Sequence, residues 1–578
     1  MSKQQFRTFY NPNSLMDSID MEKLDKSDES YFLKKDITKA QTDKIDTVLK
    51  LPMDKKLSIQ DVFIKSAEMS GRTHSNYKLY PAQIDPVLMS YINPRLFISD
   101  SPGLGKTIEA GGTYAYYRLQ QIKNNLPVSK VLVVAETIHV LGFEKEWKHL
   151  GINLLPLHGG NSMIKKERNK FNLDDYDGVV INWDGLKTNE FVLFWLENYQ
   201  HFNFGIFDET SCLRNPKSAL FRATDNIINK YQNGIERVVF LNGTPFEKDI
   251  YDYYHQFMIL KPKLIPSKSW IDGRYVVKEG KEITLRETGL DGSRRLVTRR
   301  TGEIVDYKNQ EELKERLKYY LIGRSKEDFS KSGSVPKHSY ILHLSNLTRE
   351  QKKILESNQN MSLINSPETN DSTMVFNIKT SPKLRDLLEF VPRVDKDRPL
   401  IYVENTKSQE TIVNELTNMG YRVGLINGHS DVAKKDETVD KFENNQLDIL
   451  VFNIKKSLSI KTSGRIIFYD IPTMPQETLQ ISARIDRDNY EVSKFYDFFC
   501  YAGSPEMVNI IQLAYFREKN SNKFTGKNIN IYQQLVNQLV NHFGSEKMSE
   551  VSSRIDTMYE NDVKMKNVNE QVEDLLNI

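Results

Sequence analysis

The chain has 578 residues, of which 39% are hydrophobic and 27% are charged. This balance is that of a globular protein, and the length predicts three or four compact units. A net charge of +3 is too small to indicate nucleic-acid binding by itself, so such a surface must come from local patches. No apolar run approaches the roughly 20 residues of a transmembrane helix, which excludes a membrane-spanning protein.

The two cysteines also limit the class of protein. Cys212 and Cys500 are far apart and lack the spacing of metal ligands, which argues against a disulfide framework. The start of the chain lacks the apolar segment of a signal peptide. We therefore expect an intracellular protein with no membrane partner. The usage of Lys, Asn and Ile suggests the cytoplasm of a low-GC bacterium or of a phage-infected host cell.

The first half of the chain divides into two regions. Residues 1–75 are polar and rich in Lys and Asp, and we expect an N-terminal accessory region there. Over 76–265, short apolar runs alternate with amphipathic stretches, which is typical of buried parallel strands joined by helices. The strands expected in this first lobe cover residues 96–98, 131–134, 179–181, 204–207 and 238–241.

Residues 266–380 do not continue the alternation of apolar runs and amphipathic stretches. We expect a linker there, with an Arg-rich β insertion that turns at Asp291-Gly292. The alternation returns over 381–505, which predicts a second α/β lobe. Its expected strands cover residues 400–403, 423–426, 449–452 and 466–469. Residues 506–578 have helical periodicity, so we expect a helical C-terminal region.

A glycine-bearing loop follows the first predicted strand. Residues 100–107 (DSPGLGKT) lie between that strand and a helix expected from about Thr107. Backbone N–H groups around Gly103 and Gly105 can surround a phosphate, and the start of the helix adds a favourable field. Lys106 would then reach the β- and γ-phosphates of a nucleotide, while the Thr107 hydroxyl would bind Mg²⁺. By itself, the pattern also fits an ordinary loop before a helix.

Two carboxylates follow the strand predicted over 204–207. Asp208 can hold the metal with its water shell, and Glu209 can polarise an attacking water as a general base. An acidic pair after a strand is a weak signal alone. In the expected order after the glycine loop, it predicts a site for Mg²⁺ with ATP or a related nucleotide.

Side by side, these segments resemble superfamily 2 helicases, and more closely their Swi/Snf-like branch of double-stranded DNA translocases. Residues 100–107 are similar to motif I of this branch, in which an aspartate replaces the first glycine of the general P-loop pattern. Residues 208–211 (DETS) resemble the DExx box. The following run 213–218 (LRNPKS) resembles the LKNPxS run typical of the branch.

The resemblance covers about residues 80–506 and adds several expectations. Residues 79–83 (LYPAQ) are similar to the Q motif, which implies that Gln83 reads the adenine edge. Residues 241–246 (LNGTPF) resemble motif III, with an asparagine in place of the usual serine. The resemblance then implies that Thr244 couples the phosphate state of the nucleotide to the binding of nucleic acid.

The second lobe carries further similarity. Residues 401–405 resemble motif IV, and 480–487 (QISARIDR) resemble motif VI, which implies that Arg484 and Arg487 act as arginine fingers. Taken alone, the Arg-x-x-Arg spacing would more often mark a solvated helix face. Residues 453–460 occupy the place of motif V but lack its glycines. Lys455 and Lys456 could supply side-chain charge instead of backbone contacts to nucleic acid, and a solvated basic turn is an equal alternative.

The resemblance implies a fold and a function. The fold is α/β, with two tandem RecA-like parallel-sheet lobes, a small β-containing insertion and helical terminal regions. The protein is expected to be a nucleic-acid-dependent ATPase, an ATP-dependent DNA translocase or helicase that acts on duplex or branched DNA in replication, recombination or repair. RNA is the less favoured substrate. The expected motor is a monomer, with replication or recombination proteins as possible partners.

Two alternatives stay open. The chain could be a strand-separating DNA or RNA helicase, or a nucleotide-gated motor subunit of a nuclease or transcription complex. The insertion could provide an extra contact to the duplex through its arginines, although nearby acidic residues also fit a solvated hairpin. These arginines are Arg286, Arg294, Arg295, Arg299 and Arg300.

Overall fold

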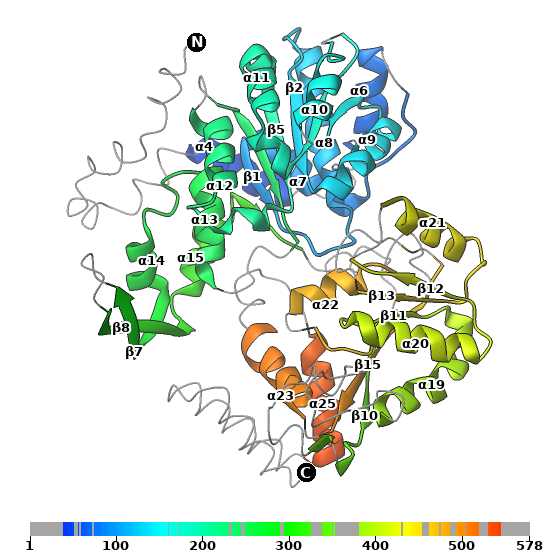
Figure 1. Cartoon of the computed structure of the whole chain (residues 1–578). Coiled ribbons are helices and arrows are strands. Elements are labelled where there is room, and N and C mark those ends of the chain that lie inside the picture. Colours follow the sequence, from blue (N-terminus) through cyan, green and yellow to red (C-terminus); the bar gives the residue numbers. More distant parts are fainter. Residues whose placement is uncertain are drawn as a thin grey trace.

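The computed structural model contains two α/β lobes, each built around its own sheet (Figure 1). It describes residues 38–50, 56, 59–71, 74–159, 161–172, 174–230, 234–243, 249–288, 294–324, 338–349, 351–352, 381–428, 432–453, 460, 462–472, 475–485, 493–502, 504–518 and 530–544. Within these ranges, no helix combines the length and the apolar character needed to span a bilayer.

Lobe 1 contains a seven-stranded sheet in the order β3-β4-β2-β5-β6-β1-β9, in which every neighbouring pair is parallel. Five of its strands contain the apolar runs predicted from the sequence, while β3 and β9 were not predicted. The strands are β1 (Arg95–Ile98), β2 (Lys130–Ala135), β3 (Leu154–Leu157), β4 (Gly178–Asn182), β5 (Phe202–Asp208), β6 (Arg237–Leu241) and β9 (Leu321–Ile322).

Helices cover both faces of this sheet, as a parallel sheet requires. Along β2, Leu132 and Val134 enter the core on one face, while Val131 and Val133 enter the core on the other. The first face packs against α10 (Asn161–Arg168), α11 (Asn189–Asn198), α12 (Ala219–Asp225), α13 (Ile250–Leu260), α14 (Lys268–Tyr275) and α15 (Gln310–Leu317). The second packs against α4 (Lys39–Lys50), α6 (Val62–Ser70), α7 (Ile84–Ile92), α8 (Lys106–Lys123) and α9 (Val140–His149).

Lobe 2 contains a six-stranded parallel sheet in the order β10-β15-β14-β11-β13-β12. Its strands are β10 (His338–Ser345), β11 (Leu400–Tyr402), β12 (Val423–Ile426), β13 (Ile449–Phe452), β14 (Arg465–Phe468) and β15 (Lys494–Tyr501). One face packs against α19 (Pro382–Val394) and α20 (Thr406–Asn418). The other packs against α21 (Val432–Glu443), α22 (Pro475–Ser482), α23 (Pro505–Gln512) and α25 (Ile531–Phe543).

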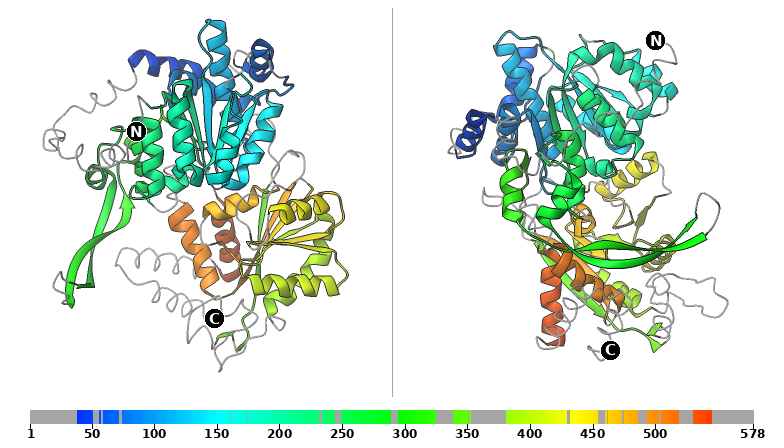
Figure 2. Two further views of the ribbon diagram at one scale, coloured as in Figure 1. Left: turned by 45° about the horizontal axis from the view of Figure 1, so that its top comes forward. Right: turned by 90° about the vertical axis from the view of Figure 1, so that its left-hand side faces the viewer.

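The predicted insertion is a β-hairpin that projects from lobe 1 (Figure 2). Strands β7 (Val276–Thr288) and β8 (Arg294–Tyr307) are antiparallel and pair along their whole length. The turn expected at Asp291-Gly292 lies outside the described residues, although Thr288 pairs with Arg294 on either side of it. In this register Glu282 lies opposite Arg300 and Glu287 lies opposite Arg295, so acidic residues accompany the arginines of the hairpin.

The fold class expected from the sequence is confirmed: two parallel sheets, a β insertion and helices in both terminal regions. The segment assigned to the linker, residues 266–380, contributes more than a connection. It supplies β9 to the sheet of lobe 1 and β10 to the sheet of lobe 2. Each strand is added in parallel, so the path between the lobes is anchored in both sheets.

Close approach of β4 to β2 depends on a glycine. A Cβ added to Gly178 would lie 2.0 Å from the backbone oxygen of Val131 on the neighbouring strand. Neither backbone can move without breaking the sheet, so we expect Gly178→Ala to lower the free energy of unfolding by about 3 kcal/mol. Denaturant unfolding followed by circular dichroism measures this loss.

Gly142→Ala is the matched control, because Gly142 lies in α9 and its added Cβ would meet nothing within 4 Å. Replacing a helical glycine by alanine should raise the free energy of unfolding by about 0.5–1 kcal/mol. Equal destabilisation by the two substitutions would contradict the predicted packing of β4 on β2.

Candidate nucleotide site

The predicted site residues of lobe 1 gather at one edge of its sheet. Parallel strands end at the same edge, so the loops that follow them lie together. The motif I loop (residues 100–107) follows β1, Asp208 ends β5, and Gly243 comes shortly after β6. These three strands are neighbours in the order β5-β6-β1, which brings together segments more than a hundred residues apart.

The motif I loop has the backbone of a tight glycine turn. Gly103 and Gly105 have φ values of 88° and 86°, which L-residues rarely adopt. The helix α8 begins directly afterwards at Lys106, whose ammonium donates to the backbone oxygen of Asp100 at 3.0 Å. A Cβ at Gly243 would stand 3.1 Å from the Lys106 nitrogen, so the lysine lies between its own loop and the segment after β6.

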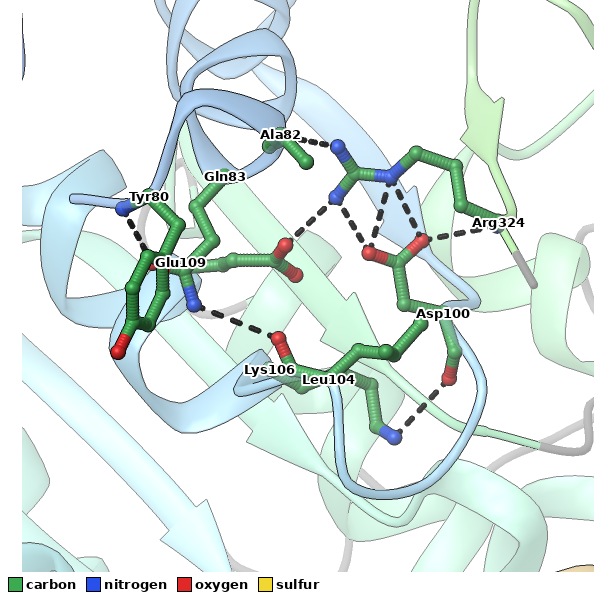
Figure 3. A network of polar contacts seen from close by, with 8 residues as sticks. All are labelled: Tyr80, Ala82, Gln83, Asp100, Leu104, Lys106, Glu109 and Arg324. Atoms are coloured by element: carbon green, nitrogen blue, oxygen red, sulfur yellow. Dashed lines mark hydrogen bonds and ion pairs between the residues drawn. The ribbon is translucent and has the colours of Figure 1, made fainter. Parts of the chain in front are cut away.

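Gln83 connects the turn at Pro81–Gln83 to this loop (Figure 3). Its side-chain oxygen accepts from the backbone N–H of Tyr80 at 3.0 Å, and its amide nitrogen donates to the backbone oxygen of Leu104 at 3.3 Å. An added Cβ at Gly105 would lie 2.5 Å from that nitrogen. Glycine at this position therefore makes room for the glutamine side chain.

Asp208 and Glu209 stand where β5 ends, as predicted. Glu209 has a φ of 50°, a strained backbone conformation for a residue with a side chain. The backbone oxygen of Asp208 accepts from the indole of Trp183 at 2.9 Å, and its carboxylate lies 3.7 Å from His139. Burial lowers the pKa of His139, but the hydrogen bond and charge of Asp208, together with the charges of Glu136 and Glu209, raise it by more. The Asp208 carboxylate therefore favours the protonated form of His139.

A buried glutamine joins the residues after β5 to those after β6. The hydroxyl of Thr210 donates to the side-chain oxygen of Gln256 at 2.6 Å, and the amide of Asn242 donates to the same oxygen at 3.4 Å. All three side chains are fully buried. The asparagine that departs from the usual serine of motif III therefore has a partner on α13, which the sequence did not reveal.

Two charged residues of this edge carried no recognisable motif. Glu109 on α8 and Arg324 after β9 form an ion pair at 2.6 Å, and Arg324 also pairs with Asp100 (Figure 3). Burial, followed by the negative charge of Asp100, raises the pKa of Glu109 well above its usual value. Arg324 lies 215 residues from Glu109 in the chain, so no local pattern could have linked them.

The structure describes only part of the predicted site in lobe 2. Arg484 is buried just after α22, and its backbone oxygen accepts from the N–H of Ile460 at 3.0 Å. Figure 1 shows α22 on the side of lobe 2 that faces lobe 1. The other predicted residues of lobe 2 lie outside the described ranges, namely Lys455, Lys456 and Arg487, and so does Thr244 of lobe 1.

No group of three or more His, Cys, Asp or Glu side chains that could hold a metal gathers among the residues that the structure describes. Mg²⁺ in nucleotide sites keeps several waters and needs only one or two protein ligands besides the phosphates. The predicted pair of Thr107 and Asp208 fits such a site and does not fit an all-protein cage.

Comparison with known proteins extends this picture. The model of the SNF2-related domain matches residues 87–392, which is more than half of the chain. The model of the helicase conserved C-terminal domain matches residues 382–489. The first match spans the motif I loop and the carboxylates after β5, and the second spans most of lobe 2.

Relatives of this chain share about a fifth of its residues. It is 21% identical over 524 residues to the uncharacterized ATP-dependent helicase YqhH of Bacillus subtilis strain 168, with 82% of this chain and 84% of the relative covered. It is also 21% identical over 451 residues to the DNA repair and recombination protein RAD54B of Mus musculus, with 68% of this chain covered. The chain spans 49% of that relative's length.

Among solved structures, the SWI2/SNF2 ATPase core of Sulfolobus solfataricus in complex with dsDNA aligns over 82% of this chain and 97% of its own, at 17% identity and a TM-score of 0.36. The classification rests on the domain matches and on the motifs that the fold brings together. The chain therefore belongs to the SNF2-related family and is a nucleic-acid-dependent ATPase of the helicase type.

Proposed function

We propose that the chain hydrolyses ATP at the carboxyl edge of the lobe 1 sheet and uses the energy to translocate along duplex DNA. One observation carries the proposal. The Lys106 ammonium lies between the motif I loop and Gly243, beside the edge where Asp208 and Glu209 end β5. Phosphates of a nucleotide would be stabilised here by three features: the lysine cation, the backbone N–H groups of the turn and the start of a helix.

Gln83 supports adenine as the base. Its side-chain oxygen has a second lone pair beside the bond from Tyr80, and its amide nitrogen has a second hydrogen beside the bond to Leu104. The side chain can therefore accept from and donate to an adenine edge while it holds the motif I loop. Which atom is oxygen and which is nitrogen follows from these two backbone partners.

The metal and the attacking water would be held by residues at the same edge. Thr107 and Asp208 would bind Mg²⁺, which, when bound, neutralises charge on the phosphates. Glu209 would accept the proton of the attacking water. Its backbone is strained directly after β5, with a φ of 50°, and residues strained in this way cluster at functional sites.

Lobe 2 would complete the site from the opposite side. Arg484 and Arg487 are the proposed arginine fingers, because a guanidinium can pair with two phosphate oxygens at once. Thr244, Lys455 and Lys456 are proposed to couple nucleotide state to DNA. Burial of Arg484 beside α22 supports a fixed orientation for this side chain.

Duplex DNA and a role in recombination or repair are supported by the relatives. Mouse RAD54B, a DNA repair and recombination protein, is similar to this chain over 451 residues. A motor that moves over any sequence contacts mainly the phosphate backbone, so its affinity for DNA should fall steeply with salt. We propose a monomeric motor that acts on duplex or branched DNA.

The catalytic roles predict the effect of two substitutions. Lys106→Ala and Glu209→Gln should each reduce DNA-stimulated ATP hydrolysis by about 100-fold or more, because one removes a phosphate contact and the other removes the base. Phosphate release with saturating duplex DNA measures the effect. Lys123→Ala at the other end of α8 and Glu197→Gln on α11 are controls that should retain activity. Equal loss in the controls would contradict the assignment.

The clearance at Gly105 predicts a defect in nucleotide binding. Gly105→Ala should raise the Kd for ATP by about tenfold, since the new Cβ would displace the Gln83 amide and the positive φ would be strained. Titration with a fluorescent ATP analogue measures this. Gly71→Ala is the control for backbone strain alone and should leave the Kd for ATP unchanged, because Gly71 also has a positive φ, of 68°, but caps α6 and has nothing within 4 Å of its added Cβ. An unchanged Kd in Gly105→Ala would contradict the contact with Gln83.

Translocation and strand separation give different products. We expect the chain to displace the third strand of a DNA triplex with ATP while a forked duplex stays paired. Fork unwinding without triplex displacement would favour the strand-separating helicase. Negligible ATP hydrolysis that rises only when a nuclease or transcription partner is added would favour the motor subunit.

A further inference from the structure

Arg324 pairs with two buried carboxyl groups beside the motif I loop (Figure 3). The side chains of Asp100 and Glu109 are fully buried, and that of Arg324 is only 13% exposed. The Arg324 Nε lies 3.0 and 3.2 Å from the two oxygens of Asp100, and one terminal nitrogen pairs with both Asp100 and Glu109. A single guanidinium thus joins the loop to the first turns of α8.

The same side chain reaches the turn that carries Gln83. The other terminal nitrogen of Arg324 donates to the backbone oxygen of Ala82, the residue before Gln83. The planar guanidinium has five N–H donors in a fixed fork, so it can hold the turn, the loop and α8 together. A lysine ammonium is a point charge with three donors and cannot span these positions in the same way.

The backbone of Arg324 is also attached to the motif I loop. Its N–H donates to the Asp100 carboxylate at 3.0 Å, and its carbonyl accepts from the N–H of Ser101 at 2.9 Å. These bonds continue the pairing of β1 with β9, in which Ser99 donates to Ile322 at 2.7 Å. Arg324 therefore stands at the end of the last strand of lobe 1, before the chain continues to β10 in lobe 2.

Charge balance explains why the cluster needs this cation. An unpaired buried carboxylate is costly, and two within one cluster repel each other. Burial lowers the pKa of Arg324, but the charges of Asp100 and then Glu109 raise it by more, so the guanidinium stays charged. The cluster thus connects the Pro81–Gln83 turn, the motif I loop and α8 through one charged side chain.

We propose that Arg324 is a positioning residue of the nucleotide site, which holds the Pro81–Gln83 turn and the motif I loop at the separation that lets adenine and phosphates be bound together. This inference rests on the proposed hydrolysis of ATP at that loop. Arg324 acts through Ala82 and Asp100 and has no direct part in the chemistry. Its loss should therefore weaken nucleotide binding and base discrimination more than turnover.

The test compares Arg324→Lys with a second buried arginine in the same lobe. Arg118 pairs with Asp177 at 3.1 Å and donates to Ser66 and Gly151, with its side chain 1% exposed. It lies on α8 twelve residues after Lys106, about 18 Å along the helix. Arg118→Lys therefore also replaces a buried guanidinium by an ammonium, but at a position away from the nucleotide site.

Steady-state hydrolysis of ATP and GTP by the full chain with duplex DNA gives the readout. We expect Arg324→Lys to raise the KM for ATP about tenfold, to change kcat less than about threefold, and to reduce the preference for ATP over GTP. Arg118→Lys should lower the melting temperature but leave the KM for ATP and the base preference as in the wild type. An Arg324→Lys variant with wild-type KM and base preference overturns the proposal.

Asp100→Asn keeps the test decisive where Arg324→Lys does not fold. Loss of this charge relieves the repulsion of Glu109, while the amide can keep one bond to Arg324, so we expect a folded chain with a smaller rise in KM in the same direction. A folded Asp100→Asn variant with unchanged KM and base preference overturns the inference alone. A wild-type chain that hydrolyses no ATP overturns the proposed function together with the inference.

Discussion

The arrangement of the site depends on one constraint, the parallel pairing of strands in the lobe 1 sheet. Because β1, β5, β6 and β9 run in the same direction, the residues after each strand meet at one edge. The sequence can then supply each function from a different segment: a phosphate-binding turn, two carboxylates, a small residue beside the lysine, and an arginine. Antiparallel addition of any of these strands would move its residue to the opposite edge.

Building the site has a cost that the surrounding residues offset. The motif I loop needs two glycines at positive φ, Glu209 adopts a strained backbone, and two carboxylates are buried beside the loop. Side chains outside the motifs stabilise these features, with Arg324 pairing the carboxylates and Gln256 holding Thr210 beside Asn242. The motifs supply the chemistry, and neighbouring elements of the fold keep them in position.

The sequence predicted the strands with continuous apolar runs and missed those without them. Strands such as β2 and β13 are buried on both faces, so each is a run of Val, Ile, Leu and Phe. Strand β3 contains a proline, β9 has two residues, and β15 contains Asp497, which is buried because it pairs with His343 and Arg465. Local motifs mark Lys106, Asp208 and Glu209, which the fold places at one edge of the lobe 1 sheet. Arg324 and Gln256 act through contacts between distant segments, which leave no local pattern.

The central claim is that the nucleotide binds at the carboxyl edge of the lobe 1 sheet, and hydrogen exchange of backbone amides with and without a non-hydrolysable ATP analogue tests it most directly. The account predicts slower exchange at residues 103–107, where α8 begins, and at the Pro81–Gln83 turn. It predicts unchanged exchange along β10 and α25 at the far edge of lobe 2. Protection confined to lobe 2, or no protection of the motif I loop at saturating analogue, would contradict the account.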